Sequence, residues 1–255
     1  LHRLGVEIAA VIDSRPEAPT SEHFEVLPAS EVVNTHGRLG INSIDVKTPQ
    51  GLRQMQVSGL GVSGGWNPNI HLTCHQRGRP QWDPALSAFV PSADLPKSLL
   101  VAGAANGKMT TAAAMQDAVT MAMKIAKDLG HKPKSLKLPQ TSDESVSVTP
   151  FWYVTGTQRG WVDQQNDVTV KDIKLAHQEN FRSVEHLKRY TTLGMATDQG
   201  KTSNVLGLAI MAQTAGQSIP ETLIEAEQIM QERLRKKLIK QGVKFIDPNT
   251  VYFSS

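Results

Sequence analysis

Apolar residues near the start of the chain form a short unbroken run instead of alternating with polar ones. The run Gly5-Val-Glu-Ile-Ala-Ala-Val-Ile12 predicts a strand that is buried on both faces. It ends at Asp13, and Pro16 then prevents further strand pairing. Between residues 22 and 62, short apolar segments separated by polar turns predict a meander of four strands. These segments are residues 24–27, 31–33, 41–46 and 53–57.

A second apolar run, residues 99–107, ends in a loop of small residues and leads into a longer helical pattern. We predict a helix over residues 110–129, in which Ala112–Ala114 permit close packing and Gly130 and Pro133 stop the helix. Backbone N–H groups at such a helix start attract a pyrophosphate or a ribityl oxygen. The alternative is a loop that serves only tight packing.

The polar segment 139–149 reads as a linker, and a small helical bundle is predicted beyond it. Thr169 is the expected N-cap of a helix over residues 170–178, with Asp172 at the third position. The stretch 191–194 is predicted to end the second helix, with Gly194 in a left-handed conformation. The expected N-caps of the second and third helices are Ser183 and either Thr202 or Ser203.

From residue 223 the chain changes character, which predicts a joined or truncated sequence. Residues 223–238 have a charged helical pattern with one apolar face, and Gly242 stands where a helix would end. The alternative to an ordinary helix and strand is a resemblance, confined to about 30 residues, to the segment before the β-helix of N-acetylglucosamine-1-phosphate uridyltransferase. The apolar face comprises Leu223, Ala226, Met230, Leu234 and Leu238.

Composition excludes several classes of protein. A hydrophobic content of 39% with 20% charged residues is ordinary for a globular protein, and no apolar run reaches the roughly 18 residues of a membrane helix. The net charge of +3 gives little reason to expect a nucleic-acid partner. The single Cys74 forms no internal disulfide and suits a reducing cytoplasm. With His71 and His75 it is too small a set for zinc, so no metal site is predicted.

Several motifs identify a family. Asp167-Val-Thr169, Leu187-Lys-Arg-Tyr-Thr-Thr-Leu-Gly-Met195 and Gly207-Leu-Ala-Ile-Met-Ala212 resemble the alpha subunit of heterotetrameric sarcosine oxidase. Gly64-Gly-Trp-Asn-Pro68 and the tryptophan-containing stretch at residues 80–91 resemble the same subunit. The resemblance covers residues 1 to about 222, so the chain is expected to be a fragment of such a subunit.

The helical bundle also resembles bacterioferritin-associated-ferredoxin-like modules, in which four cysteines hold an iron–sulfur cluster. None of the corresponding positions carries a thiolate here, and a cluster normally needs four. The resemblance therefore implies the helical scaffold without a cluster. The positions concerned are Asp163, Gln165, Asp198 and Ser203.

An acid at the tip of a buried strand is where a dinucleotide-binding domain contacts a ribose hydroxyl. On spacing alone Asp13 has two interpretations: it ends an unrelated strand, or it follows a glycine-rich turn that would lie before residue 1. The family resemblance favours the second. The predicted fold class is therefore α/β, a partial Rossmann-like FAD/NAD(P)-binding fragment with a β-meander. The expected domains are residues 1–57 and 58–138 (two partial nucleotide-binding domains), 139–149 (linker), 150–222 (helical module) and 223–255.

The resemblance implies oxidation of sarcosine by a cytoplasmic heterotetramer. The alpha subunit is expected to hold NAD, the beta subunit FAD, and their interface FMN; gamma and delta subunits complete the complex, and a downstream domain absent from this sequence takes folate. Ala104 replaces an acid that contacts flavin in related reductases, which fits NAD. No catalytic residue is predicted, and the fragment alone is expected to be inactive. The predicted cofactor-binding residues are Asp13, Arg15, Gly64, Gly103, Ala104, Met109 and Thr111; those at the flavin and subunit interface are Lys188, Arg189, Thr191, Thr192, Lys201 and Thr202.

Three alternatives remain. One is a subunit of a related amine, opine or proline dehydrogenase, a group that usually retains the cluster cysteines. Another is a non-catalytic interaction module, a helical bundle that docks a partner. For the basic block at residues 188–201 itself, the alternative to a phosphate site is a solvated helix face with caps. The third takes the uridyltransferase-like tail as the identity and leaves residues 1–222 unexplained.

Overall fold

The computed structural model describes residues 1–74, 78–96, 98–134, 136–142, 146, 148–156, 159–223, 236–237, 240, 244–247 and 250–252. Its helices and strands form a mixed α/β fold, which confirms the fold class at that level. Two compact units share the chain. The first comprises residues 1–30, 36–43 and 54–151, and the second comprises residues 31–35, 44–53 and 152–255. The domain boundaries expected from the sequence, and their Rossmann-like character, stay predictions.

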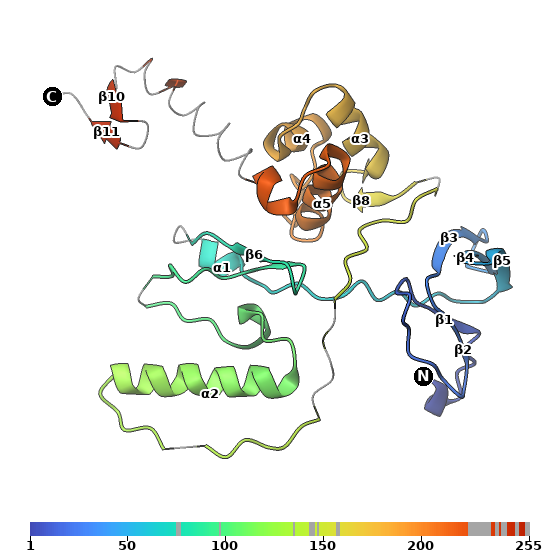
Figure 1. Ribbon diagram of the computed structural model, residues 1–255, viewed down its shortest axis with the longest axis horizontal. Coiled ribbons are helices and arrows are strands. Elements are labelled where there is room, and N and C mark those ends of the chain that lie inside the picture. The colour runs from blue at the N-terminus through green and yellow to red at the C-terminus, as the bar shows by residue number, and fades with distance from the viewer. Residues whose placement is uncertain are drawn as a thin grey trace. The chain divides into compact units, whose positions relative to one another are not determined.

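The first strand of unit 1 is shorter than its apolar run. β1 (Ala10–Ile12) pairs in parallel with β2 (Glu25–Leu27), as Figure 1 shows. Within the described part of the chain, only these three residues of the predicted strand 5–12 pair with another strand. The residues before them make no strand-to-strand hydrogen bonds with described residues. The short 3-10 helix η1 (His2–Leu4) precedes them and ends at Gly5.

The middle of unit 1 contains a short helix and a two-stranded ribbon. α1 (His71–Cys74) precedes β6 (Gln81–Asp83), which pairs antiparallel with β7 (Ala88–Val90). The turn between the strands is fixed by Asp83, because its Oδ1 accepts hydrogen bonds from the N–H groups of residues 85 and 86. Such local side-chain bonds are the usual reason that aspartate occurs in turns.

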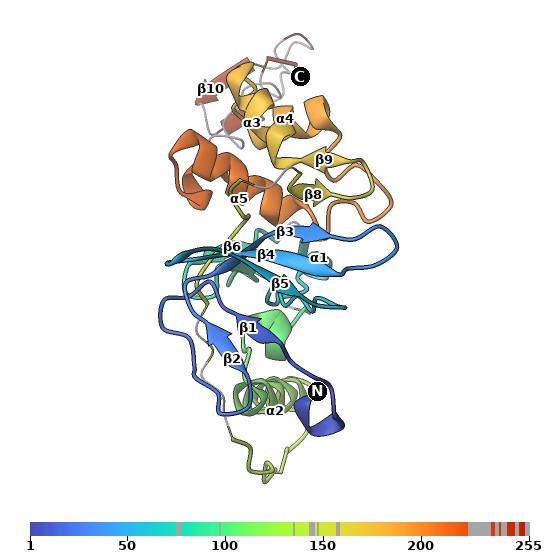
Figure 2. The same cartoon turned by 90° about the vertical axis from the view of Figure 1, so that its right-hand side faces the viewer.

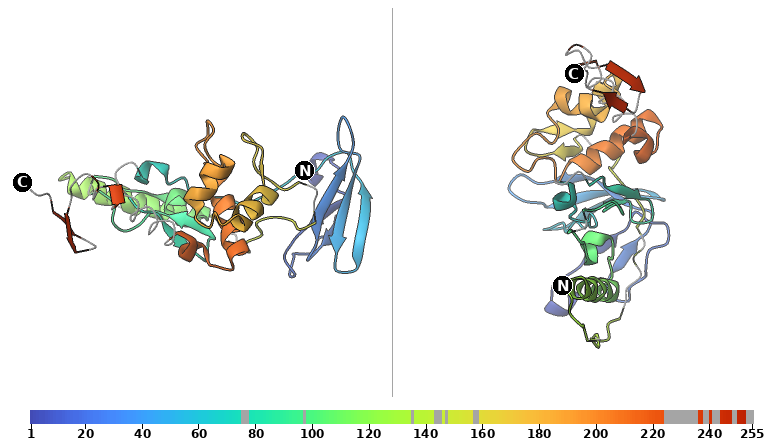
Figure 3. Two further views of the ribbon diagram at one scale, coloured as in Figure 1. Left: turned by 90° about the horizontal axis from the view of Figure 1, so that it is seen from above. Right: turned by 90° about the vertical axis from the view of Figure 1, so that its left-hand side faces the viewer.

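The predicted helix of unit 1 forms almost as expected. A 3-10 turn, η2 (Gly103–Asn106), is followed by α2 (Thr111–Asp128), which Figure 3 shows nearly end-on in its right-hand panel. The Thr110 hydroxyl caps the helix by accepting the Ala113 N–H at 3.2 Å, as an N-cap threonine should. None of the helix residues is buried.

Three consecutive strands form a sheet in the order β3-β4-β5, visible in Figure 2. They are β3 (Glu31–His36), β4 (Ser43–Thr48) and β5 (Gly51–Gln56), which confirms three of the four strands predicted for the meander. The remaining predicted strand, residues 24–27, is not part of this sheet, because it contains β2 and pairs with β1 instead. Ile44 and Val46 in β4 are buried and are two residues apart, so they lie on the same face of the strand.

Unit 2 contains the main apolar core of the chain. Three of its described helices gather together in Figure 1, after a short ribbon of two strands. Burial of apolar side chains that meet across these helices contributes about 1.5–3 kcal/mol each. The ribbon is β8 (Trp161–Asp163) and β9 (Val168–Thr169), and the helices are α3 (Val170–Gln178), α4 (Val184–Thr191) and α5 (Asn204–Ala215). The fully buried large side chains are Ile173, Leu187, Leu193, Ile210 and Met211.

The helix boundaries of unit 2 follow from local capping, with two differences from expectation. The Asp172 carboxylate accepts the Thr169 N–H at 2.8 Å, which confirms this half of the predicted capping box. Ser183 accepts the His186 N–H as the N-cap of α4. The last residue of α4 is Thr191, within the predicted stretch 191–194, and Gly194 has a positive φ of 67°. However, the left-handed residue that directly follows the helix is Thr192, at φ 63°. Ser203 is the N-cap of α5 but makes no side-chain capping bond.

The C-terminal region is described only in part. β10 (Lys244–Asp247) pairs antiparallel with β11 (Thr250–Tyr252). The predicted apolar helix face beyond Leu223, and Gly242 at its expected end, lie outside the described residues. Within the described part of the chain, no helix has the length and apolarity needed to cross a membrane.

Candidate functional site

The predicted ribose contact, Asp13, is already bound by a neighbour. The Arg15 guanidinium donates to both carboxylate oxygens, with Nη2 at 2.6 Å from Oδ2, and the Arg15 N–H donates to Oδ1 at 2.9 Å. The side-chain hydrogen bond from Arg15 holds the pKa of Asp13 below its ordinary value and raises the pKa of Arg15. A carboxylate has about four lone-pair positions, so a ribose hydroxyl would have to replace one of these contacts.

The small-residue loop before α2 has an acidic support that the sequence reasoning missed. The Asp117 Oδ2 accepts the Gly103 N–H at 2.9 Å and the Asn106 side-chain amide at 3.2 Å. Asp117 lies in the second turn of α2. The sequence signal that could have revealed its role is an acid among alanines on a helix face. The Gly103 N–H is therefore engaged inside the protein, and the negative charge beside it works against a pyrophosphate at this point.

The remaining predicted cofactor residues of unit 1 occupy exposed or half-exposed positions. Gly64 lies in residues 57–70, outside any helix or strand, and a Cβ added to it would meet nothing within 4 Å. Ala104 and Thr111 are exposed and Met109 is half-buried. Their part in cofactor binding stays a prediction.

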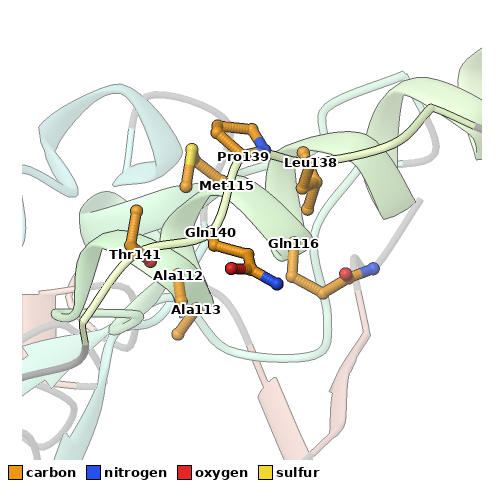
Figure 4. A pocket seen from close by; sticks show the side chains of 8 residues that line it. All are labelled: Ala112, Ala113, Met115, Gln116, Leu138, Pro139, Gln140 and Thr141. Atoms are coloured by element: carbon orange, nitrogen blue, oxygen red, sulfur yellow. The ribbon is translucent and has the colours of Figure 1, made fainter.

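A cavity of about 410 Å³ lies beside the first turns of α2, as Figure 4 shows. Met115 and Gln116 face the segment Leu138–Thr141 across it. None of the predicted cofactor residues is among its lining residues, which are Ala112, Ala113, Met115, Gln116, Leu138, Pro139, Gln140 and Thr141.

In unit 2, Asp163 joins two loops that are far apart in sequence. Its side chain is buried at 3% exposure, and its Oδ2 accepts the Gly194 N–H at 2.8 Å. Its Oδ1 accepts the N–H groups of Gln165 and Asn166 at 2.9 and 3.2 Å. At a position where the related module carries a cysteine, this carboxylate therefore binds backbone N–H groups.

Asp198 has an equivalent local role in the next loop. Its carboxylate accepts the Gly200 N–H, the Thr202 N–H and, at 2.6 Å, the Thr202 hydroxyl. The Thr202 hydroxyl, followed by these backbone N–H groups, holds the pKa of Asp198 below its ordinary value. The carboxylates of both acids are thus occupied by hydrogen bonds within the module.

Two polar atoms near these loops are buried without a partner among the described residues: the Ser203 Oγ and the Asn204 Oδ1. The Asn204 side chain fills the space where a Cβ on Gly194 or Gly200 would stand. Both glycines have positive φ angles, 67° and 76°, so only glycine fits without strain and without displacing the amide.

The predicted flavin and interface residues lie on α4 and the loop after it, but their hydroxyls are engaged. Thr191 donates to the Leu187 carbonyl, Thr192 to the Thr191 carbonyl, and Thr202 to Asp198. Each hydroxyl has a single proton, so these groups would have to rearrange before donating to a phosphate. Lys188 is half-buried, while Arg189 and Lys201 are exposed.

No group of three or more His, Cys, Asp or Glu side chains in the described part of the chain could hold a metal ion. Cys74 is exposed, and its thiol lies 3.7 Å from the Ile70 carbonyl. His75 lies outside the described residues.

Most of the chain is similar in sequence to one type of subunit. Residues 157–228 match the sarcosine oxidase A3 domain family. The chain is 38% identical over 226 residues to the sarcosine oxidase subunit alpha of Rhizobium meliloti (strain 1021), covering 87% of this chain and 23% of that protein. It is 33% identical over 232 residues to the subunit alpha of Corynebacterium sp. (strain U-96), covering 82% of this chain and 24% of that one. The chain therefore spans less than a quarter of the length of these curated relatives.

A solved structure shares the fold. L-proline dehydrogenase from P. horikoshii matches with a TM-score of 0.61 over 84% of this chain and 46% of that chain, at 15% sequence identity. This likeness concerns the fold alone.

Proposed function

Because the chain is homologous over most of its length to part of the sarcosine oxidase alpha subunit, we propose that it is a segment of the NAD-binding alpha subunit of a flavin-dependent sarcosine oxidase. The observation that carries the proposal is the 38% identity over 226 residues, which extends through both structural units. The A3 domain match supports it independently for residues 157–228. The complete enzyme would oxidise the CH–NH group of N-methylglycine in the cytoplasm.

In this proposal unit 1 contributes to the NAD site. The Asp13 carboxylate is fixed by Arg15, so it would meet a ribose hydroxyl without first losing side-chain freedom. The loop at residues 103–106 is similarly fixed by Asp117. Because that carboxylate is negative, the loop suits a ribose or the nicotinamide end better than a phosphate.

Unit 2 would contribute to assembly. Its helical core is complete in itself, and its basic residues Lys188, Arg189 and Lys201 are placed on α4 and the following loop. We propose that this block meets the phosphate of FMN, or the surface of the FAD-bearing beta subunit, in a heterotetramer with gamma and delta subunits. Binding of folate would belong to a downstream domain that this sequence does not include.

The runner-up is a subunit of a related proline or opine dehydrogenase, although the likeness to L-proline dehydrogenase shows a shared fold and does not by itself favour that function. The sequence identities favour the sarcosine enzyme, because they are 33–38% against 15% for that structure. A purely non-catalytic interaction module would bind no dinucleotide, which separates it from both enzymes.

The test is to produce a full-length alpha subunit containing this sequence together with its partner subunits. The complex should reduce oxygen with sarcosine as substrate and do so much more slowly with proline. The isolated 255-residue chain should oxidise neither, because the described residues contain no catalytic constellation. Preferred oxidation of proline would support the runner-up, and sarcosine oxidation by the isolated chain would contradict the placement of the active site elsewhere.

NAD binding is tested by calorimetry on the full-length subunit. Asp13→Ala should weaken binding about tenfold, which corresponds to about 1.4 kcal/mol for a lost hydrogen bond to a charged group. Glu17→Ala, at an exposed acid four residues away, is the matched control. Equal affinity for both variants and the parent would remove Asp13 from the site.

The interface role is tested by Lys188→Glu with Arg189→Glu in the full-length subunit, against Lys171→Glu on the exposed side of α3 as the control. FMN content or assembly should fall only in the first variant. If FMN content, assembly and turnover all match the parent, the block is a solvated helix face.

A further inference from the structure

Unit 2 contains a second cavity, of about 230 Å³, that the proposed function does not use. Its floor is apolar and comes from the helical core, with Val162 7% exposed and Ile210 fully buried. Its wall carries three aromatic side chains from the segment before and within β8: Trp152, Tyr153 and Trp161. All of the lining residues belong to unit 2, so the cavity depends on that unit alone.

Positive charge is concentrated at these aromatic rings. The Arg159 guanidinium lies over the Trp161 ring, 5.7 Å from its centroid, and among the described residues it is the only formally charged group that lines the cavity. The Lys174 ammonium lies 5.0 Å from the centroid of the Tyr153 ring. Arg159, Lys174 and the 42%-exposed Trp161 are all accessible to solvent. A cation held over an aromatic face gains about 0.5–1 kcal/mol at an exposed site, which helps fix Arg159 in this orientation.

From this combination we propose that the cavity binds a small planar aromatic anion, with its ring on the apolar floor and its carboxylate at Arg159. The buried floor favours a flat apolar body, and the aromatic walls favour stacking against its π-face. The guanidinium is permanently charged and binds carboxylates in a bidentate geometry. The proposed ligand site does not depend on whether the protein takes part in sarcosine oxidation.

The size of the cavity narrows the class of ligand. Pockets for drug-sized molecules measure about 300–1,000 Å³, so this smaller cavity suits a molecule of one or two rings. A cationic ligand is disfavoured by Arg159 and Lys174, since like charges repel in a partly desolvated site. A neutral aromatic compound is also disfavoured, because it offers no carboxylate to the Arg159 guanidinium.

Calorimetry on the purified chain tests this with indole-3-acetate as the probe. Two control compounds separate its features: cyclohexaneacetate has the charge without the aromatic ring, and indole has the ring without the charge. Indole-3-acetate should bind with a Kd of about 0.1–1 mM and at least about tenfold more tightly than either control. Absence of saturable heat up to about 10 mM, or equal affinities for the three compounds, would overturn the proposal.

Substitutions then locate the site. Arg159→Gln should weaken indole-3-acetate binding about tenfold and leave binding of indole unchanged, because only the charge contact is lost. Trp161→Leu should weaken both. The matched control is Arg182→Gln, an exposed arginine that does not line the cavity. Because Arg159 is exposed, its replacement is expected to preserve the fold, which circular dichroism verifies; unchanged affinity in Arg159→Gln would place the probe elsewhere and refute the proposal.

Discussion

The buried carboxylate of Asp163 should be among the most important polar groups for the stability of the helical module. Asp163→Ala removes three hydrogen-bond acceptor contacts at once, two within its own turn and one to the loop containing Gly194. The Gly194 residue is buried, so its N–H would be left without a partner. Leaving a buried donor unsatisfied costs about 1–3 kcal/mol.

The two turn contacts add less, because Gln165 is exposed and its N–H can bond to water instead. Their loss is worth about 0.5–1 kcal/mol in all, so the free energy of unfolding of the module should fall by about 1.5–4 kcal/mol. Asp163→Asn keeps one carbonyl oxygen and should cost roughly half as much.

Urea unfolding followed by circular dichroism measures the change, and hydrogen exchange at the Gly194 amide reports the long-range contact directly. Gln164→Ala, at the exposed adjacent residue, is the control and should stay within about 0.5 kcal/mol of the parent. If Asp163→Ala unfolds at the same urea concentration as the control and the Gly194 amide keeps its protection, the hydrogen bond between Asp163 and Gly194 contributes nothing to stability. That result would refute the prediction.

Other predictions concern neighbouring loops. Gly194→Ala should destabilise the module by at least about 1 kcal/mol, because the added methyl meets Asn204 at a positive φ; thermal unfolding would show it, and an unchanged Tm would disprove it. Thr202→Val removes the main group that lowers the pKa of Asp198, so NMR titration should find that pKa closer to its ordinary 3.8. Since that pKa is lowered on folding, its stabilisation is present above the unfolded pKa and is lost as pH falls through the folded value. Asp117→Ala should speed amide exchange in the 3-10 turn before α2, with helix exchange unchanged as the control.

Local sequence signals predicted helix starts better than helix ends. The starts depend on a side chain binding a nearby N–H, as at Thr110 and Ser183, and such contacts involve residues only three apart. The end of α4 was expected within residues 191–194, as observed, but the left-handed conformation of Thr192 directly after the helix was not predicted. There Asn166 donates to the Thr192 carbonyl from 26 residues away, a contact that no local pattern reveals.

In the candidate sites, too, single residues could be predicted from the sequence, whereas contacts between distant residues could not. Asp13 was recognised because an acid follows an apolar run, but its bidentate partner Arg15 was grouped with it only as a cofactor residue. Asp117 was missed because the loop it supports precedes it by 14 residues. The aromatic cavity also escaped sequence reasoning, because its floor at Ile210 and its wall at Trp161 are distant in sequence and meet only through packing of the helical core.

Periodicity, caps and motifs are properties of neighbouring residues, so they were enough to predict the mixed α/β character, three strands of the meander, four helices and the kinship with sarcosine oxidase alpha subunits. What Asp163 and Asp198 bind could be learned only from the packed structure. Whether Asp163 binds a metal, solvent or backbone depends on which distant N–H groups the fold brings to it, and here the fold brings the N–H of Gly194. Burial makes that contact strong, and burial is a property of the packed module rather than of the local sequence.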